Sequence, residues 1–198
     1  DAQESRGLGD VYKRQVYEEN KQITFHFETN KAKIYADMDA IKLGVILDNL
    51  LSNAVKFTPD GGSVRLSLFY REETGLLDIC VSDTGSGIPQ QDIPYIFQRF
   101  FQSPHSGNKE GTGIGLYLVK TYTELHGGHI NGVTSNEGKG TSIGLNIPVI
   151  AVEKEEIPAT QVKKQLESLP VLKPIEAESQ DEKFLSNIIR LIEDLSLI

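Results

Sequence analysis

The strongest structural signal in the chain is the run Asp48-Asn49-Leu50-Leu51-Ser52-Asn53-Ala54-Val55-Lys56-Phe57. From residue 39 onward, apolar residues recur at the three-to-four spacing of a helix that is buried along one stripe. Within that helix Asn49, Asn53 and Lys56 share one face, because they are four and three residues apart. Such a polar stripe is either an exposed helix face or a site for a divalent ion and phosphate groups, and the helix alone leaves both interpretations open.

Strands are predicted on both sides of this helix. Residues 23–28 and 33–37 alternate apolar and polar side chains around a polar turn, which is typical of two strands. The run Thr58-Pro59-Asp60-Gly61-Gly62 ends the helix, because proline lacks the backbone donor and the glycines permit a turn. Four further strands are predicted in two pairs, at 63–71 with 76–82 and at 130–135 with 141–148.

Two glycine-rich runs lie where a ligand can approach the backbone. The first, Asp83-Thr84-Gly85-Ser86-Gly87-Ile88-Pro89, follows the strand at 76–82, and Asp83 offers an acceptor there. The second, Gly111-Thr112-Gly113-Ile114-Gly115-Leu116, opens a helix predicted over 114–126, whose first N–H groups and dipole suit a phosphate. Its spacing is neither the dinucleotide-binding fingerprint nor a P-loop. Either run alone is a weak signal.

A short helix and a mobile stretch are predicted between these two runs. The helix covers residues 92–101, and residues 102–110 are polar without any hydrophobic period. We therefore expect a flexible segment directly before the second glycine run.

The composition is that of a globular protein. The chain has 198 residues, of which 38% are hydrophobic and 24% charged, and no apolar run approaches the roughly 20 residues that cross a bilayer. The net charge of −8 argues against a general nucleic-acid binder, because such binding needs clustered Lys and Arg. A nucleotide in a local pocket stays possible, since Mg²⁺ and a few fixed donors neutralise phosphates. Cys80 is the single cysteine, which excludes an internal disulfide and favours a small buried side chain in a reducing compartment.

The main domain is predicted at residues 16–150, with different segments on either side. Residues 1–15 are expected to be a non-native or disordered leader, since they are polar and lack the apolar stretch of a signal peptide. Residues 151–180 mix Glu, Lys and Pro without periodicity, as a linker does. Residues 181–198 regain helical spacing, and this amphipathic helix either starts a truncated further domain or docks on the main one.

Taken in order, the motifs resemble those of the ATP-binding catalytic domain of bacterial sensor histidine kinases, in the GHKL ATPase superfamily (HATPase_c type). Residues 48–57 resemble the N box, 83–87 the G1 box, 96–101 the F box, 111–116 the G2 box and 138–141 the last glycine box. The resemblance covers residues 23–149. It implies an α/β fold of the Bergerat type, a two-layer α/β sandwich whose mixed sheet packs on about three helices and encloses ATP under a lid.

The resemblance implies a phosphate end and a base end for the site. At the phosphate end, Asn53 would coordinate Mg²⁺, Lys56 would contact phosphate and Asn49 would line the same cleft. The lid hinge and phosphate cradle would be Gly111, Gly113 and Gly115. At the base end, the implied residues are Phe57 beside the adenine, Asp83 as acceptor for its amino group, Gly85 and Gly87 for close approach, and Thr141 near the base. The implied nucleotide-binding set is completed by Ile88, Thr112, Ile114 and Leu116.

The sequence departs from the family pattern at Gln102, where the family often carries Arg after the aromatic pair. Arg99 and Lys109 are candidates for the missing charge, although either is equally interpreted as a solvated lid residue. None of the histidines fits a phosphoacceptor, which in this family lies on a separate dimerisation domain; the four are His26, His105, His126 and His129.

The implied function is to present the γ-phosphoryl of ATP, with Mg²⁺, to a histidine on a dimerisation domain, with no catalytic residue of its own. Hydrolytic relatives such as gyrase, MutL and Hsp90 use a Glu one turn before the metal-binding Asn as general base. Here that position is Asn49, an amide without a basic lone pair, which favours a phosphotransferase. The alternatives are another GHKL ATPase or serine kinase acting as a nucleotide-driven switch, and a module that binds no nucleotide.

The resemblance also implies partners and a location. The expected partners are the dimerisation domain of the same protein and a response regulator receiver domain, with no nucleic acid and no membrane contact by this segment. The expected location is the cytoplasmic part of a membrane-anchored sensor.

Overall fold

The described part of the chain is a β-sheet with helices packed against one face. The computed structural model describes residues 10–18, 21–31, 36–104 and 111–151. In chain order the elements are β1 (Asp10–Glu18), β2 (Lys21–Thr29), β3 (Ala36–Asp37), α1 (Ala40–Phe57), β4 (Ser63–Arg71), β5 (Leu76–Asp83), a 3₁₀ helix (Ile93–Tyr95), α2 (Gly115–Leu125), β6 (His129–Asn136), β7 (Gly140–Pro148) and β8 (Ile150–Ala151).

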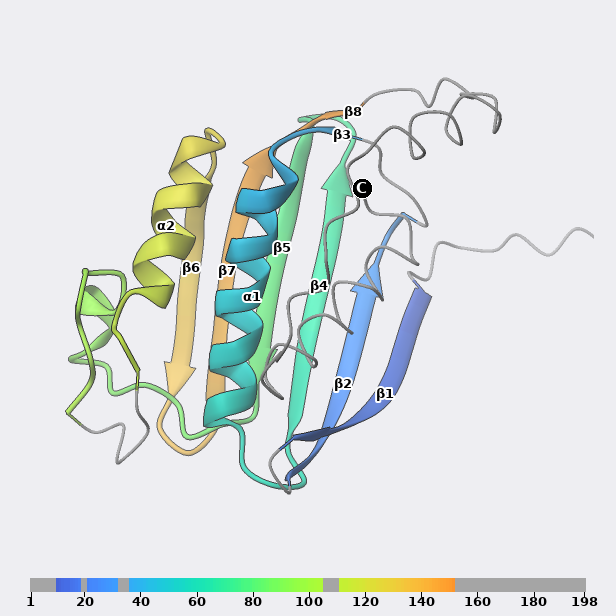
Figure 1. The fold of residues 1–198 in the computed structure, drawn as a ribbon. Helices are drawn as coiled ribbons and strands as arrows, with labels where there is room; N and C mark the ends of the chain where they lie inside the picture. The colour runs from blue at the N-terminus through green and yellow to red at the C-terminus, as the bar shows by residue number, and fades with distance from the viewer. Residues whose placement is uncertain (1–9, 19–20, 32–35, 105–110, 152–198) are drawn as a thin grey trace, which may run out of the picture.

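The main sheet is mixed and has six strands. Their order is β1-β2-β4-β5-β7-β6, and the β2–β4 pair is parallel while every other neighbouring pair is antiparallel. Figure 1 shows α1 and α2 side by side on the same face of this sheet. The predicted two-layer α/β sandwich is therefore confirmed, with two α-helices and one 3₁₀ turn in the described residues where about three helices were expected.

The core lies between the two layers. Alternate residues of β4 point inward, so Val64, Leu66 and Leu68 are all buried. The apolar stripe of α1 covers them with side chains that include Ile46 and Leu50. The helix begins at its N-cap Asp39, whose carboxylate accepts the backbone N–H of Lys42 at 3.0 Å. Because the apolar stripe of α1 is buried against the sheet, the polar face of the helix points to the side of the helix layer.

Two predicted elements differ from the structure. The strand expected at 33–37 is described only as β3, which pairs with β8 in a separate two-stranded sheet. Both edges of β2 are occupied, by β1 and by β4, so no edge is left for a hairpin partner. The helix expected at 92–101 shrinks to Ile93–Tyr95. A helix that reached residue 101 is excluded, because Phe100 has a positive φ of 65° and its N–H donates to the carbonyl of Gly113 at 2.8 Å.

The segments predicted to flank the main domain are only partly described. Strand β1, rich in Val and Tyr, pairs with β2 along its length, so the chain is extended across the boundary predicted between residues 15 and 16. The linker, apart from Ala151, and the C-terminal helix lie outside the described residues, as do most of the stretch expected to be mobile, His105 and Lys109. Among the described helices, none combines the length and the apolar character needed to span a membrane.

Candidate functional site

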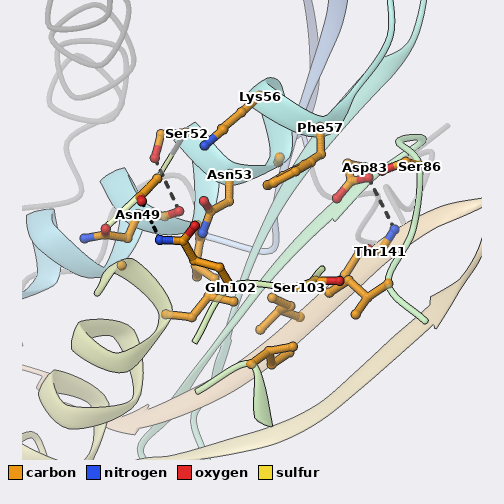
Figure 2. A pocket seen from close by; sticks show the side chains of 18 of the residues that line it. Asn49, Ser52, Asn53, Lys56, Phe57, Asp83, Ser86, Gln102, Ser103 and Thr141 are labelled. Carbon is orange, nitrogen blue, oxygen red and sulfur yellow. Dashed lines mark hydrogen bonds between the residues drawn. The ribbon is translucent and has the colours of Figure 1, made fainter. Parts of the chain in front are cut away.

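A cavity of about 430 Å³ opens between α1, the loop after β5 and the start of α2. Its lining comes from segments far apart in the sequence, because the sheet order places β5 beside β7 and the two helices together. In Figure 2 the polar side chains of α1 lie toward one end, and Asp83 with Thr141 lies toward the other. The cavity thus has two distinct polar ends, one on α1 and one at Asp83 and Thr141.

The α1 end is formed by the predicted stripe, since Asn49, Asn53 and Lys56 all line the cavity. The Asn49 amide donates one hydrogen bond to the carbonyl of Val45, one turn earlier, at 2.7 Å. Its oxygen faces the first residue of α2, where a β-carbon on Gly115 would be only 2.6 Å away. The Lys56 ammonium lies 5.4 Å from the Phe57 ring centroid and near Gly111, whose β-carbon would be 3.2 Å from it. Amide oxygens and an ammonium therefore gather where α2 and its preceding glycines begin.

The other end is built around Asp83, the last residue of β5. Its Oδ1 accepts the backbone N–H of Gly85 at 2.7 Å and that of Thr141 at 3.3 Å. Burial raises the pKa of the Asp83 carboxyl above its usual value, and the two N–H groups oppose that rise. Both of these bonds engage Oδ1, and neither of them uses Oδ2.

The glycines around Asp83 permit backbone contacts that a side chain would block. A β-carbon on Gly85 would lie 2.6 Å from the Phe57 carbonyl oxygen, and one on Gly140 would lie 1.9 Å from the Asp83 carbonyl oxygen. At Gly87 the φ of +73° is one that L side chains rarely adopt, and its β-carbon would be 2.1 Å from the Asn136 carbonyl oxygen. The glycines bring the loop after β5 against the β6–β7 turn and the end of α1.

Nearly all of the predicted nucleotide-binding residues line this one cavity. Besides those already described, they are Phe57, Gly87, Ile88, Gly111, Thr112, Gly113, Leu116 and Thr141. Gly85 and Ile114 do not line it. Gly85 instead packs behind the Asp83 carboxylate, and Ile114 is the N-cap residue of α2.

Several lining residues were not predicted. The polar ones are Ser52, Ser86, Gln102, Ser103 and Glu137, and the apolar ones are Leu50, Ala54, Val81, Pro89, Ile96, Phe101 and Ile143. Some carried a usable signal: Ser52 is three residues from Asn49 and four from Lys56, and Val81 and Ile143 are each two residues from a predicted residue on the same strand. Phe101 ends the run that resembles the F box and Gln102 follows it, but their place in the cavity depends on how this loop folds.

Gln102 and Arg99 have contacts within the protein. The Gln102 amide donates to the Gly111 carbonyl at 2.7 Å, so it joins the two described ends of the stretch 105–110. The Arg99 guanidinium lies 4.6 Å from the ring centroid of Phe100, and Arg99 is not among the cavity-lining residues. Lys109 lies outside the described residues.

The described histidines lie away from the cavity. His126 ends α2, with Nδ1 at 2.7 Å from the Tyr122 carbonyl, and His129 contacts Asn146. His26 lies in β2, and none of these three lines the cavity. Across the residues that the structure describes, no three His, Cys, Asp or Glu side chains form a cluster that could hold a metal ion. On α1, the side-chain oxygens that a cation could use include the amide oxygens of Asn49 and Asn53.

Comparison with known proteins gives one consistent family. A family model described as "Histidine kinase-, DNA gyrase B-, and HSP90-like ATPase" matches residues 38–151. The sensor histidine kinase WalK of Bacillus subtilis is 41% identical over 117 residues, which is 58% of this chain and 19% of that protein. The circadian input-output histidine kinase CikA of Synechococcus elongatus is 38% identical over 146 residues, or 73% of this chain and 18% of that protein.

Solved structures agree with these matches. The mycobacterial sensor histidine kinase MprB is similar with a TM-score of 0.55 and 30% identity, covering 65% of this chain and 86% of that one. Full-length ShkA in complex with AMPPNP is similar with a TM-score of 0.54 and 28% identity, covering 67% of this chain and 27% of that one. The chain spans 19% and 18% of the lengths of WalK and CikA, so it corresponds to one part of such proteins.

Proposed function

Because this chain belongs to the histidine kinase-, DNA gyrase B- and HSP90-like ATPases, as an ATP-binding catalytic domain of the sensor histidine kinase type, we propose that its cavity presents the γ-phosphoryl of ATP to a histidine on a dimerisation domain. The single observation that carries the proposal is that the α1 stripe and Asp83 line opposite ends of one cavity. Such an arrangement suits a ligand with an anionic end and a base with a hydrogen-bond donor.

The base of ATP lies at the Asp83 end in this proposal. Asp83 Oδ2 accepts from the adenine amino group, while Oδ1 keeps its two backbone bonds. A guanine carbonyl at the same place would face a carboxylate, so the site prefers adenine. Phe57 and Ile143, which both line the cavity, provide apolar contact for the ring.

The phosphates lie at the α1 end, beside the start of α2. Asn53, Lys56 and Asn49 line this part of the cavity, where Asn53 would hold Mg²⁺ and Lys56 would contact a phosphate. The N–H groups of the Gly111–Gly115 run and the N-terminus of α2 add positive potential there. Mg²⁺ would supply charge neutralisation for the transferred phosphoryl, as in phosphoryl transfer generally.

At the α1 end of the cavity, no described lining residue is a carboxylate that could activate water, which is why we propose transfer over hydrolysis. The position one turn before Asn53 is Asn49, and an amide cannot take up a proton. Asp48 is acidic, but it is not among the lining residues, and the geometry of 3.6 residues per turn puts it about 100° around the helix. The chain therefore positions ATP and leaves the nucleophile to its partner.

The partners and setting follow from the same proposal. The nucleophile is a histidine on the dimerisation domain of the parent protein, and the phosphoryl group then passes to a response regulator receiver domain. We place this domain in the cytoplasmic part of a membrane-anchored sensor. The relatives support these proposals only in general terms, since they are much longer proteins named as sensor kinases.

The test is a phosphotransfer assay with the partner supplied separately. The chain is incubated with γ-labelled ATP, Mg²⁺ and the histidine-bearing dimerisation domain of the parent protein, and acid-labile phosphohistidine is measured on that domain. We expect label only when the acceptor histidine is present, and an acceptor with His replaced by Ala is the matched control. Rapid ATP turnover by the chain alone, with no phosphohistidine formed, would favour the ATPase alternative instead.

A further inference from the structure

Ser135 lies directly behind the base end of the cavity and does not line it. It is on β6, it is 3% exposed, and it joins three parts of the structure. Its hydroxyl accepts the backbone N–H of Ile88 at 2.7 Å, donates to the Gly140 carbonyl at 3.1 Å and lies 2.9 Å from the Thr141 hydroxyl. Ser135 therefore links the loop after β5 to the first residues of β7.

These contacts fix which way the Thr141 hydroxyl points. A serine hydroxyl carries one proton and two acceptor lone pairs. The proton of Ser135 is used on Gly140, and one lone pair is used by Ile88. With the Ser135 proton assigned to Gly140, the proton in the 2.9 Å contact comes from Thr141. The Thr141 oxygen is left with lone pairs only, so it can accept a hydrogen bond from a ligand but cannot donate one.

We propose that Ser135 is a positioning residue that makes Thr141 a hydrogen-bond acceptor at the base end of the cavity. Thr141 then accepts directly from the exocyclic amino group of the base, and it does not donate to the ring nitrogen N1. This inference rests on the proposed function, since it concerns how the same cavity recognises adenine.

The position of Thr141 beside Asp83 strengthens the consequence. The Thr141 backbone N–H donates to Asp83 Oδ1 at 3.3 Å, so the two side chains belong to one end of the cavity (Figure 2). Both then present acceptors, a carboxylate oxygen and a hydroxyl oxygen. An amino group has two hydrogens to give, whereas the carbonyl of hypoxanthine or guanine has none. Ser135 thus adds to the selection of an amino-bearing base without touching it.

The experiment removes Thr141's hydroxyl and single groups of the base in turn. Affinities of wild type and Thr141→Val are measured, by displacement of a fluorescent ATP analogue, for ADP, purine riboside diphosphate, which lacks the amino group, and 1-deazaadenosine diphosphate, which lacks N1. We expect the substitution to weaken ADP and the 1-deaza compound by about 3- to 10-fold, the range of one neutral hydrogen bond, and to leave purine riboside diphosphate nearly unchanged. Any of three results would overturn the proposal. They are a loss of affinity that disappears with the 1-deaza compound, a loss of affinity that is equal for all three nucleotides, and no loss of affinity for ADP.

A second variant tests Ser135 itself. In Ser135→Ala the Thr141 hydroxyl is released, so the preference for ADP over purine riboside diphosphate should fall relative to the preference over the 1-deaza compound. If Ser135 had a purely structural role, its replacement would lower the affinity for all three nucleotides by the same factor, and that result would contradict the assignment. Ser142→Ala is the matched control, because Ser142 is next to Thr141 but bonds Ser82 and Cys80. If Ser135→Ala does not fold, Ser135→Cys, whose thiol is only a weak donor and acceptor, replaces it in the same comparison and the same shift in preference is expected. If wild type binds no nucleotide, the proposed function fails as well.

Discussion

At the base end of the cavity, Asp83 is held by backbone N–H groups while burial opposes its charge. Both hydrogen bonds reach Oδ1, and burial raises the pKa of this carboxyl. Because burial disfavours the charged form, ionisation of Asp83 lowers the stability of the folded protein, and the two N–H groups offset part of that effect. A carboxyl pKa that is shifted by burial in a cavity is typical of residues that bind a ligand.

The substitution Asp83→Asn separates the effect of the charge on stability from its effect on ATP affinity. The Asn oxygen can keep both backbone bonds, so the variant without nucleotide should unfold at the same or a higher denaturant concentration than wild type at neutral pH. Its ATP affinity should fall by roughly 10- to 100-fold, because a hydrogen bond to a charged acceptor is lost. Denaturation and calorimetric titration measure the two effects. Asp60→Asn is the control, since Asp60 also accepts a backbone N–H, from Gln22. Unchanged ATP affinity in Asp83→Asn would count against this assignment.

The pH dependence follows from the raised pKa of Asp83. The folded protein holds this proton more tightly than the unfolded chain, so the ionised carboxylate lowers stability above the folded pKa, and that cost vanishes as pH falls. Binding of adenine favours the ionised form, so affinity should fall as pH drops through the raised pKa. Phosphate groups of the nucleotide titrate too, but equally for both proteins. The ratio of wild-type to Asp83→Asn affinity should therefore decrease from neutral pH downward, and a constant ratio would disprove the link.

Asn53→Ala tests the opposite end of the cavity. If Asn53 holds Mg²⁺, its removal should lower the Mg²⁺-dependent part of ATP affinity by at least about tenfold, since even indirect supports of a metal site cost 10- to 100-fold. Titrations with and without Mg²⁺ measure that part. Asn131→Ala is the control, because Asn131 bonds Asn146 and does not line the cavity. A variant with intact metal dependence would move the metal site elsewhere.

At the scale of elements, the periodic segments were predicted well and the irregular ones were not. Helix α1 and the pairs β4–β5 and β6–β7 follow from spacing and from their glycine turns. The shortened 3₁₀ helix was not predictable, since it depends on a hydrogen bond from Phe100 to Gly113 across the loop. The strand predicted at 33–37 is described only over Ala36–Asp37, and its pairing with β8 depends on contacts between segments far apart in the sequence. The local sequence pattern predicts whether a segment forms a helix or a strand. Its length and the strand with which it pairs depend on contacts between distant parts of the chain.

Two glycines in the helices should respond differently to alanine. Gly44 is inside α1, and a β-carbon added there would meet nothing within 4 Å, so Gly44→Ala should raise the free energy of unfolding by about 0.5–1 kcal/mol without changing ATP affinity. Gly115→Ala places a β-carbon 2.6 Å from Asn49 Oδ1 and should lower ATP affinity by displacing that amide. Chemical denaturation and nucleotide titration of both variants make the comparison. Gly115→Ala with wild-type affinity would show that the contact between Asn49 and α2 is unimportant for the ligand.

At the scale of the whole molecule, the sheet brings together the motifs that the sequence keeps apart. The predicted residues of the N box and both glycine runs could be assigned because each motif is local, and almost all of them line one cavity. The Ser135 contact could not, because Ser135 and Ile88 are 47 residues apart and meet only when β6 lies against the loop after β5. Residues that line the cavity were thus more predictable than the residues that hold them in place.

The most direct measurement is a crystal structure of this chain with a nonhydrolysable ATP analogue and Mg²⁺. We predict the adenine amino group within hydrogen-bonding distance of Asp83 Oδ2, the phosphates beside Lys56 and the start of α2, and the metal on the Asn53 amide oxygen. A nucleotide bound outside this cavity, or bound with its base at the α1 end, would contradict the account.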